Sequence, residues 1–93
     1  FDATEAVRLG LVNRVVPRAR LLDETLALAN LLASKPPLAL ASALGAIHRG
    51  MDAAIDEGLA IEEAAFASIV RTHDAHEGVQ AFLEKRSPGF LGR

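Results

Sequence analysis

Apolar residues recur at helical spacing along most of the chain, and short breaks separate the segments that carry them. The pattern predicts helices over about residues 3–9, 20–34, 38–49 and 53–72, and a last helix that starts near Asp74 and stops before Arg86. Three valines within residues 12–16 predict one short strand, the only strand candidate. We therefore expect a mostly α chain of about five helices and one short strand.

Residues that start or stop helices stand at the expected boundaries. Asp2 and Asp74 each precede a Glu by three residues, which is typical of an acid-capped helix start. Gly10 permits the left-handed conformation that ends a first helix, and the double proline at 36–37 stops the second. Gly50 is the expected terminator of the third helix.

Two of the predicted helices are apolar on more than one face. Leucines cover a wide arc of the helix at 20–34, and small residues surround the apolar stripe of the helix at 38–49. Gly58 lies inside the following helix at a cost of about 1 kcal/mol relative to Ala, which indicates a close contact. We expect partner chains or further sequence to cover the apolar faces that this chain leaves open.

Composition limits the class of protein. The 93 residues are 51% hydrophobic, carry a net charge of −2 and include no Cys. This apolar content is enough for a core, and the small charge predicts neither nucleic acid nor an anionic membrane as a partner. The absence of Cys excludes disulfides, thiolate metal sites and a Cys nucleophile. No apolar run reaches the roughly 18 residues of a membrane span, and the start on Phe1 suggests a piece of a longer protein.

Residue patterns alone point to no catalytic constellation. Ser42, Ser68 and Ser87 do not lie in a strand-turn-helix elbow, and no Gly-rich phosphate loop is present. Glu62 and Glu63 are adjacent on a helix and point about 100° apart, so they cannot converge on one substrate.

The one cluster of histidines surrounds the start of the last predicted helix. His73 and His76 stand beside Asp74 and Glu77, but no third ligand is placed to converge with them. We interpret the cluster as a solvated helix N-terminus and expect no metal site.

Five segments, in this order, carry a family resemblance. They are DATEA (2–6), GLVNRVVP (10–17), SKPPLAL (34–40), EGLAIEEAAF (57–66) and DAHEGVQAFLEKRSPGF (74–90). Together they resemble the C-terminal part of the enoyl-CoA hydratase/isomerase, or crotonase, family, and the resemblance runs over the whole chain. The closing segment is the most specific of the five.

The resemblance implies a crotonase-like α/β spiral fold in which a spiral of ββα units precedes these residues. Residues 1–17 would then be the end of the spiral core, and residues 18–93 the C-terminal helical region that contacts other subunits of a trimer or dimer of trimers. Such packing would account for the apolar faces. One departure is the apolar Leu44, where many family members carry Lys.

The resemblance also implies chemistry on an acyl-CoA. In the family, two backbone N–H groups hold the thioester oxygen while acidic side chains move protons or activate water. Both lie upstream of residues like Phe1, so we expect no catalytic residue here and no activity from this chain alone. The implied activity of the parent is that of a 2-enoyl-CoA hydratase (a lyase), with isomerase or other crotonase-type chemistry left open. An inactive helical assembly module is the alternative.

Three residues match ligand contacts of the family. By this resemblance Lys85 reaches the phosphate region of CoA, while Phe82 and Phe66 lie near the bound CoA and acyl chain. Core packing of the two Phe side chains and a solvated helix end at Lys85 remain alternatives, as does Arg86 as the phosphate partner. The expected substrate is a CoA thioester, with no covalently bound cofactor, and the expected location is the cytoplasm.

Overall fold

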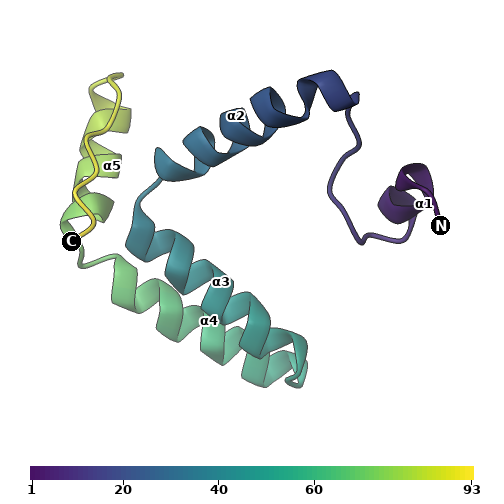
Figure 1. Cartoon of the computed structure of the whole chain (residues 1–93). Helices are drawn as coiled ribbons and strands as arrows, with labels where there is room; N and C mark the ends of the chain where they lie inside the picture. The colour runs from purple at the N-terminus through teal and green to yellow at the C-terminus, as the bar shows by residue number, and fades with distance from the viewer. The chain divides into compact units, whose positions relative to one another are not determined.

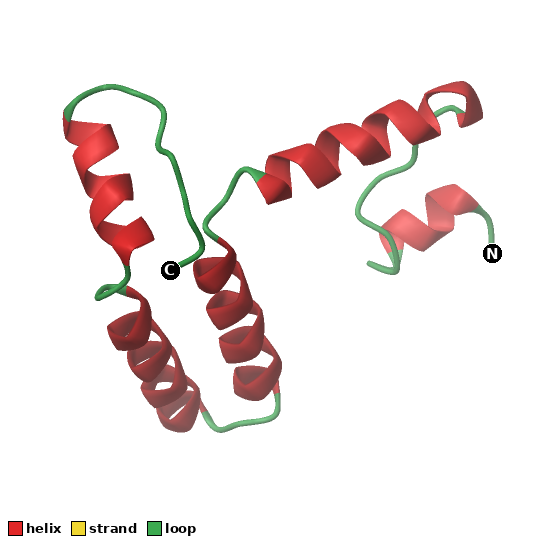
Figure 2. Ribbon diagram, turned by 60° about the vertical axis from the view of Figure 1, so that its left-hand side comes forward, coloured by secondary structure: helices red, strands yellow, loops and turns green.

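A computed structural model describes residues 1–93 as a helical chain with no β-strand (Figures 1 and 2). Its elements are α1 (Ala3–Arg8), a 3₁₀ turn η1 (Arg18–Arg20), α2 (Leu21–Ala33), α3 (Pro37–Met51), α4 (Ile55–Ile69) and α5 (His73–Leu83). The five predicted helices are confirmed, most of them with ends within a few residues of those expected.

The chain divides into two compact units, Phe1–Leu32 and Ala33–Arg93. This division follows contacts within the chain. The division by role, with a spiral-core end at 1–17 and an oligomerisation region at 18–93, stays a prediction.

In the first unit, α1 is closed at both ends by local hydrogen bonds. The backbone N–H of Glu5 donates to Oδ1 of Asp2 at 2.8 Å, which confirms the predicted acid cap. After the helix, Gly10 adopts φ +73° and Leu11 N–H donates to the Ala6 carbonyl at 2.9 Å. The left-handed Gly10 confirms the predicted end of the helix, and with this hydrogen bond it forms a Schellman turn.

The predicted strand at 12–16 is wrong. Residues 14–17 have no regular secondary structure, and no other segment of this chain pairs with them. A strand is stable only when its N–H and C=O groups bond to a neighbouring strand, and Val-rich composition cannot supply that neighbour. Instead Arg14 and Arg20 both bind the carboxylate of Glu24, which ties this segment to α2.

Helix α2 buries none of its residues within this chain. Its exposed leucines lie on several sides of the helix: Leu21, Leu22, Leu26, Leu28, Leu31 and Leu32. Part of the helix lines a shallow groove of about 390 Å³ together with residues 12–16.

In the second unit, α3 and α4 pack side by side as a hairpin (Figures 1 and 2). A Cβ placed on Gly58 would lie 3.8 Å from the carbonyl oxygen of Gly50 and 3.9 Å from its Cα. The predicted close contact at Gly58 is therefore confirmed. Farther along the hairpin, Ser42 Oγ donates to the Ala65 carbonyl at 3.3 Å.

The expected role of Gly50 as a terminator is wrong. Helix α3 continues through Gly50 to Met51, and its C-cap is Asp52. Gly50 does not adopt a positive φ. Its missing side chain instead lets the backbone of α4 approach at Gly58.

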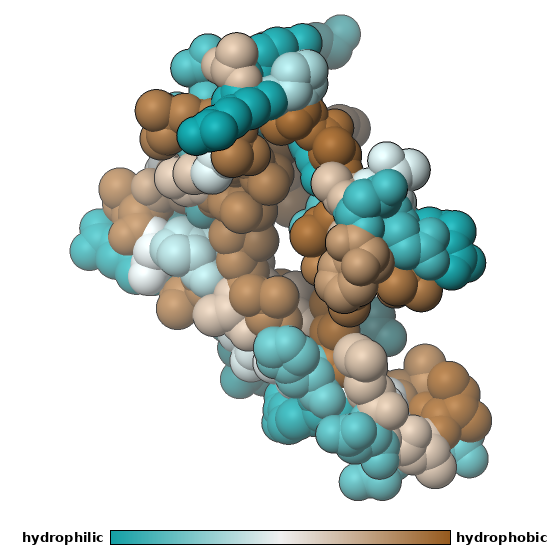
Figure 3. Space-filling model, turned by 45° about the vertical axis from the view of Figure 1, so that its right-hand side comes forward, coloured by the Kyte–Doolittle hydropathy of each residue, from teal (hydrophilic) through white to brown (hydrophobic).

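Large apolar side chains remain at the surface of this chain. The buried residues are only Ala6, Ala81 and Asp74, whereas residues such as Phe1, Met51 and Phe82 are at least 78% exposed. Figure 3 shows hydrophobic residues spread over the visible face. The composition predicted enough apolar content for a core, but these residues do not form a large one among themselves.

Candidate functional site

The residues after α5 fold back along that helix. One buried carboxylate holds the last of them, residues 90–93, which we call the tail. Asp74 is 2% exposed. Its Oδ1 accepts from the Leu91 N–H at 2.7 Å and its Oδ2 from the Gly92 N–H at 2.8 Å. Its own N–H donates to the Arg93 carbonyl at 3.1 Å. The tail is thus fixed to the first turn of α5.

This geometry corrects the sequence prediction for the start of α5. The N-cap is Thr72, whose Oγ1 accepts from the Ala75 N–H at 3.1 Å, and not Asp74. A threonine hydroxyl satisfies the helix end, so the carboxylate of Asp74 is available for the tail.

The ionised form of Asp74 is favoured despite its burial. Desolvation alone would raise the pKa of Asp74, but the N–H groups of Leu91 and Gly92 outweigh it together with the adjacent His73, so the pKa lies below its ordinary value. The carboxylate therefore stays charged and accepts both hydrogen bonds at neutral pH.

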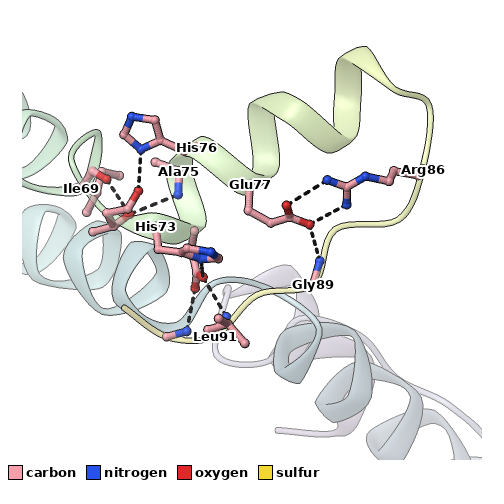
Figure 4. Close-up of polar contacts among 11 residues, drawn as sticks. Ile69, His73, Ala75, His76, Glu77, Arg86, Gly89 and Leu91 are labelled. Carbon is pink, nitrogen blue, oxygen red and sulfur yellow. Dashed lines mark hydrogen bonds and ion pairs between the residues drawn. The ribbon is translucent and has the colours of Figure 1, made fainter.

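A second set of polar contacts closes the turn between α5 and the tail (Figure 4). Arg86 donates to Oε1 and Oε2 of Glu77 at 2.6 and 2.9 Å, and Glu77 Oε1 also accepts from the Gly89 N–H at 2.8 Å. Arg86 Nε donates to Glu84 at 2.5 Å. The guanidinium of Arg86 and the N–H of Gly89 lower the pKa of Glu77 to about 2.

Lys85 lies at the centre of this turn in an uncommon backbone conformation. Its φ is +54°, the only positive value at a non-glycine residue in the chain. The Lys85 N–H donates to the Phe82 carbonyl at 3.2 Å, and the Arg86 N–H donates to the Ala81 carbonyl at 3.0 Å. These bonds form a Schellman turn with Lys85 at the position that glycine usually takes. The Lys85 side chain is exposed.

The structure brings together two of the three predicted ligand residues. Phe82, 82% exposed, lies one turn before Lys85 on the same helix end. Phe66 is 65% exposed and lies on α4, where it lines a groove between α3 and α4. Neither Phe side chain is buried within this chain. Their contact with CoA stays a prediction.

The groove beside Phe66 is mostly apolar. Its volume is about 580 Å³, and neither Phe82 nor Lys85 is among its lining residues. Small residues of α3 and α4 are among its lining residues, including Gly50 and Gly58.

Three of the other polar side chains named above, those of Ser42, Ser68 and His76, contact backbone carbonyls. Ser42 and Ser68 both donate to the Ala65 carbonyl, at 3.3 and 2.6 Å. His76 Nδ1 lies 2.9 Å from the Thr72 carbonyl. No group of three or more His, Asp or Glu side chains is arranged to hold a metal ion, and no helix is both long and apolar enough to span a membrane.

Sequence reasoning missed the contacts that hold the tail. Glu77 pairs with Arg86 across nine positions, and Asp74 binds residues 17 and 18 positions later. The one available signal was the break at Ser87-Pro88-Gly89, which ends the helix and allows the chain to reverse.

Comparison with known proteins identifies the family. All of residues 1–93 match the model of the enoyl-CoA hydratase/isomerase family. A 2,3-dehydroadipyl-CoA hydratase of Escherichia coli is 42% identical over the whole chain, and a crotonyl-CoA hydratase of Syntrophomonas wolfei is 41% identical. The chain belongs to the enoyl-CoA hydratase/isomerase family.

Solved structures agree with this assignment. A crystal structure of an enoyl-CoA hydratase from Geobacillus kaustophilus matches 100% of this chain and 36% of its own, with a TM-score of 0.93 and 43% identity. One from Bacillus anthracis matches 98% of this chain and 35% of its own, with a TM-score of 0.93 and 38% identity. The helical arrangement described above is therefore one that enoyl-CoA hydratases contain.

The chain spans about 36% of the length of both hydratases from Escherichia coli and Syntrophomonas wolfei. The comparisons confirm the expected family. They do not bear out the narrower expectation that the chain is the C-terminal part of the family. The share of a relative's length that the chain matches does not say which end of the relative is matched.

Proposed function

We propose that the full-length protein, meaning the complete gene product that contains these residues, is an enoyl-CoA hydratase. It would add water across the double bond of an enoyl thioester of CoA. The observation that carries this proposal is the 42% identity, over the entire chain, to a 2,3-dehydroadipyl-CoA hydratase. Isomerase or other crotonase-type activity is the alternative within the family.

Within that enzyme, we assign these residues to binding CoA. The ammonium of Lys85 would bind the 3′-phosphate of CoA as a compact point charge. Phe82, exposed one turn away, offers an aromatic face to the nucleotide, and Phe66 lies beside an apolar groove suited to an acyl chain. The groups that polarise the thioester and activate water would lie in the part of the family's length that this chain does not span.

The proposal includes further properties of the full-length protein. It needs no covalently bound cofactor, acts in the cytoplasm, and assembles as a trimer or dimer of trimers. The exposed leucines of α2 support assembly, since apolar surface of this extent is normally covered.

The first test is turnover of crotonyl-CoA by the full-length protein, followed as loss of the conjugated enoyl thioester absorbance. Formation of 3-hydroxybutyryl-CoA is the expected result. Product with a shifted double bond would support the isomerase alternative instead. No reaction with any enoyl-CoA would overturn the proposed activity.

A second candidate function has its own supporting observation. The scarcity of buried apolar residues favours an inactive assembly module, which would bind only copies of itself or of its parent. Light scattering of the 93-residue chain, combined with a CoA titration, distinguishes the hydratase from the assembly module. Assembly without CoA binding, in both the chain and the full-length protein, would favour the module.

A further inference from the structure

We propose that Glu77 and Arg86 are positioning residues for Lys85, because their ion pair holds the left-handed turn that aims the lysine ammonium at a phosphate of CoA. The inference rests on the proposed function, which supplies the phosphate. It adds a role for two side chains that do not themselves need to touch the ligand.

Two equivalent turns in this chain show what is unusual about Lys85. Helices α1 and α5 both end in a Schellman turn with the same pair of hydrogen bonds. In the first turn the left-handed residue is Gly10, at φ +73°, and in the second it is Lys85, at φ +54°. Glycine adopts this conformation freely, whereas a residue with a Cβ resists it. The turn after α5 thus keeps a side chain where the fold alone favours glycine.

Contacts on both sides of Lys85 hold it in that conformation. Arg86, the next residue, is fixed to Glu77 by two hydrogen bonds of 2.6 and 2.9 Å. Glu84, the preceding residue, binds the same guanidinium. Glu77 also receives the Gly89 N–H at 2.8 Å, so one carboxylate fixes the chain three positions beyond the arginine. Residue 85 is left with little freedom to rotate.

The same contacts decide which cation of the turn is available to a ligand. The guanidinium of Arg86 is occupied by the carboxylates of Glu77 and Glu84. Lys85 has no ion pair and its side chain is exposed. Lys85, rather than Arg86, is therefore the cation that can approach a phosphate.

The expected loss of CoA affinity follows from how strongly a residue with a Cβ disfavours the left-handed conformation. A residue with a Cβ disfavours the left-handed state by a factor of about 5 to 30. We call the ion pair of Glu77 with Arg86, together with the Gly89 N–H bond to Glu77, the clamp. If the clamp is removed, the fraction of molecules with Lys85 in the left-handed conformation falls. The apparent affinity for CoA falls in proportion to that fraction. We expect a factor near the lower limit, about fivefold, because the two hydrogen bonds of the Schellman turn remain.

The test measures KM and kcat of the Glu77→Gln and Arg86→Lys variants of the full-length protein. We expect KM for crotonyl-CoA to rise about fivefold in each variant while kcat stays unchanged. The same variants should leave KM unchanged for crotonyl-dephospho-CoA, which lacks the 3′-phosphate. A general loss of folding would lower kcat and affect both substrates equally.

Two matched controls lie elsewhere in the chain. Glu5→Gln breaks the comparable ion pair of Glu5 with Arg8, on a helix that ends in the same kind of turn. Lys35→Ala removes the only other lysine of these 93 residues. Neither should change KM for either substrate.

A double-mutant cycle gives the deciding result. Once Lys85→Ala has removed the ammonium, adding Glu77→Gln should have no further effect on KM. Additive effects, or an equal rise in KM for the dephospho substrate, would show that the clamp does not act through Lys85 and would overturn the inference.

Calorimetric titration with CoA and dephospho-CoA separates this inference from the proposed activity. An inactive protein whose CoA affinity still depends on Glu77 through Lys85 would overturn the hydratase assignment and support the positioning role. Turnover that is insensitive to Lys85 and Glu77 would do the reverse. Absence of CoA binding would overturn both.

Discussion

The N–H of Gly92 donates to Oδ2 of Asp74 at 2.8 Å, across 18 residues of sequence. The N–H of Leu91 donates to the other oxygen at 2.7 Å, so both oxygens of one buried carboxylate hold the tail. Close to this contact, a Cβ added at Gly92 would meet Pro37 Cγ at 3.1 Å. The tail therefore passes close to the start of α3 as well as α5.

Asp74→Asn is expected to release the tail, because an amide has one acceptor oxygen where the carboxylate has two. The measurement is hydrogen exchange of the Leu91 and Gly92 amides, which should become faster in the variant. Asp56→Asn, in the first turn of α4, is the matched control and should leave both amides unchanged. Unaltered exchange in Asp74→Asn would contradict the described contact.

The low pKa of Glu77 predicts a pH dependence with a definite sign. The folded pKa of about 2 lies below the ordinary value of 4.5, so the unfolded chain binds more protons between these pH values. The stabilisation from Glu77 is therefore complete above pH 4.5 and is lost as the pH falls toward 2. NMR titration of the Glu77 carboxyl carbon should give a midpoint near 2, and a midpoint near 4.5 would show that the ion pair with Arg86 is absent in solution.

The backbone of Lys85 predicts that stability and ligand binding are opposed at this position. Lys85→Gly should raise the free energy of unfolding by about 1 kcal/mol, because glycine adopts the left-handed conformation without the Cβ penalty. The reverse change, Gly10→Lys, should lower it by a similar amount, since no atom lies within 4 Å of a Cβ there and only the backbone cost remains. Urea unfolding of both variants checks the pair. A destabilised Lys85→Gly would refute the left-handed assignment.

The close approach of α3 and α4 predicts a size limit at Gly58. Gly58→Ala should be neutral or stabilising by up to about 1 kcal/mol, because its Cβ would meet Gly50 at ordinary contact distance while helix propensity improves. Gly58→Leu should destabilise by about 1–3 kcal/mol by forcing the helices apart.

Gly45→Leu is the control for that substitution, because Gly45 lies on α3 and a Cβ placed on it would have no atom within 4 Å. Its effect on the urea midpoint should be much smaller than that of Gly58→Leu. Equal effects of the two leucines would mean that α3 and α4 are not in contact at Gly58.

Local signals predicted the helices well, because each depends on residues within one or two turns. Asp2, Gly10 and the double proline act through their own backbone and their nearest neighbours, and the structure confirms the boundaries that they predict. The predicted terminator role of Gly50 is wrong because Gly58 on the opposite helix sets the role of this glycine. The predicted strand at 12–16 is wrong because a strand depends on a partner strand.

The candidate site was predictable only in part. Lys85, Phe82 and Phe66 were named through a family resemblance, and the left-handed turn at Lys85 carried no sequence signal because a lysine usually avoids it. The clamp joins Glu77, Arg86 and Gly89 through a reversal of the chain that spacing along one helix cannot show. Such contacts appear only once the path of the tail is known.

The most direct test of the proposed role is the affinity of the full-length protein for CoA and dephospho-CoA, measured with Lys85 intact and with Lys85→Ala. An enoyl-CoA hydratase that holds the 3′-phosphate through this turn should bind CoA more tightly than dephospho-CoA, and Lys85→Ala should abolish the difference. Equal affinities for the two ligands in the unaltered protein would contradict the assignment of this turn to CoA binding.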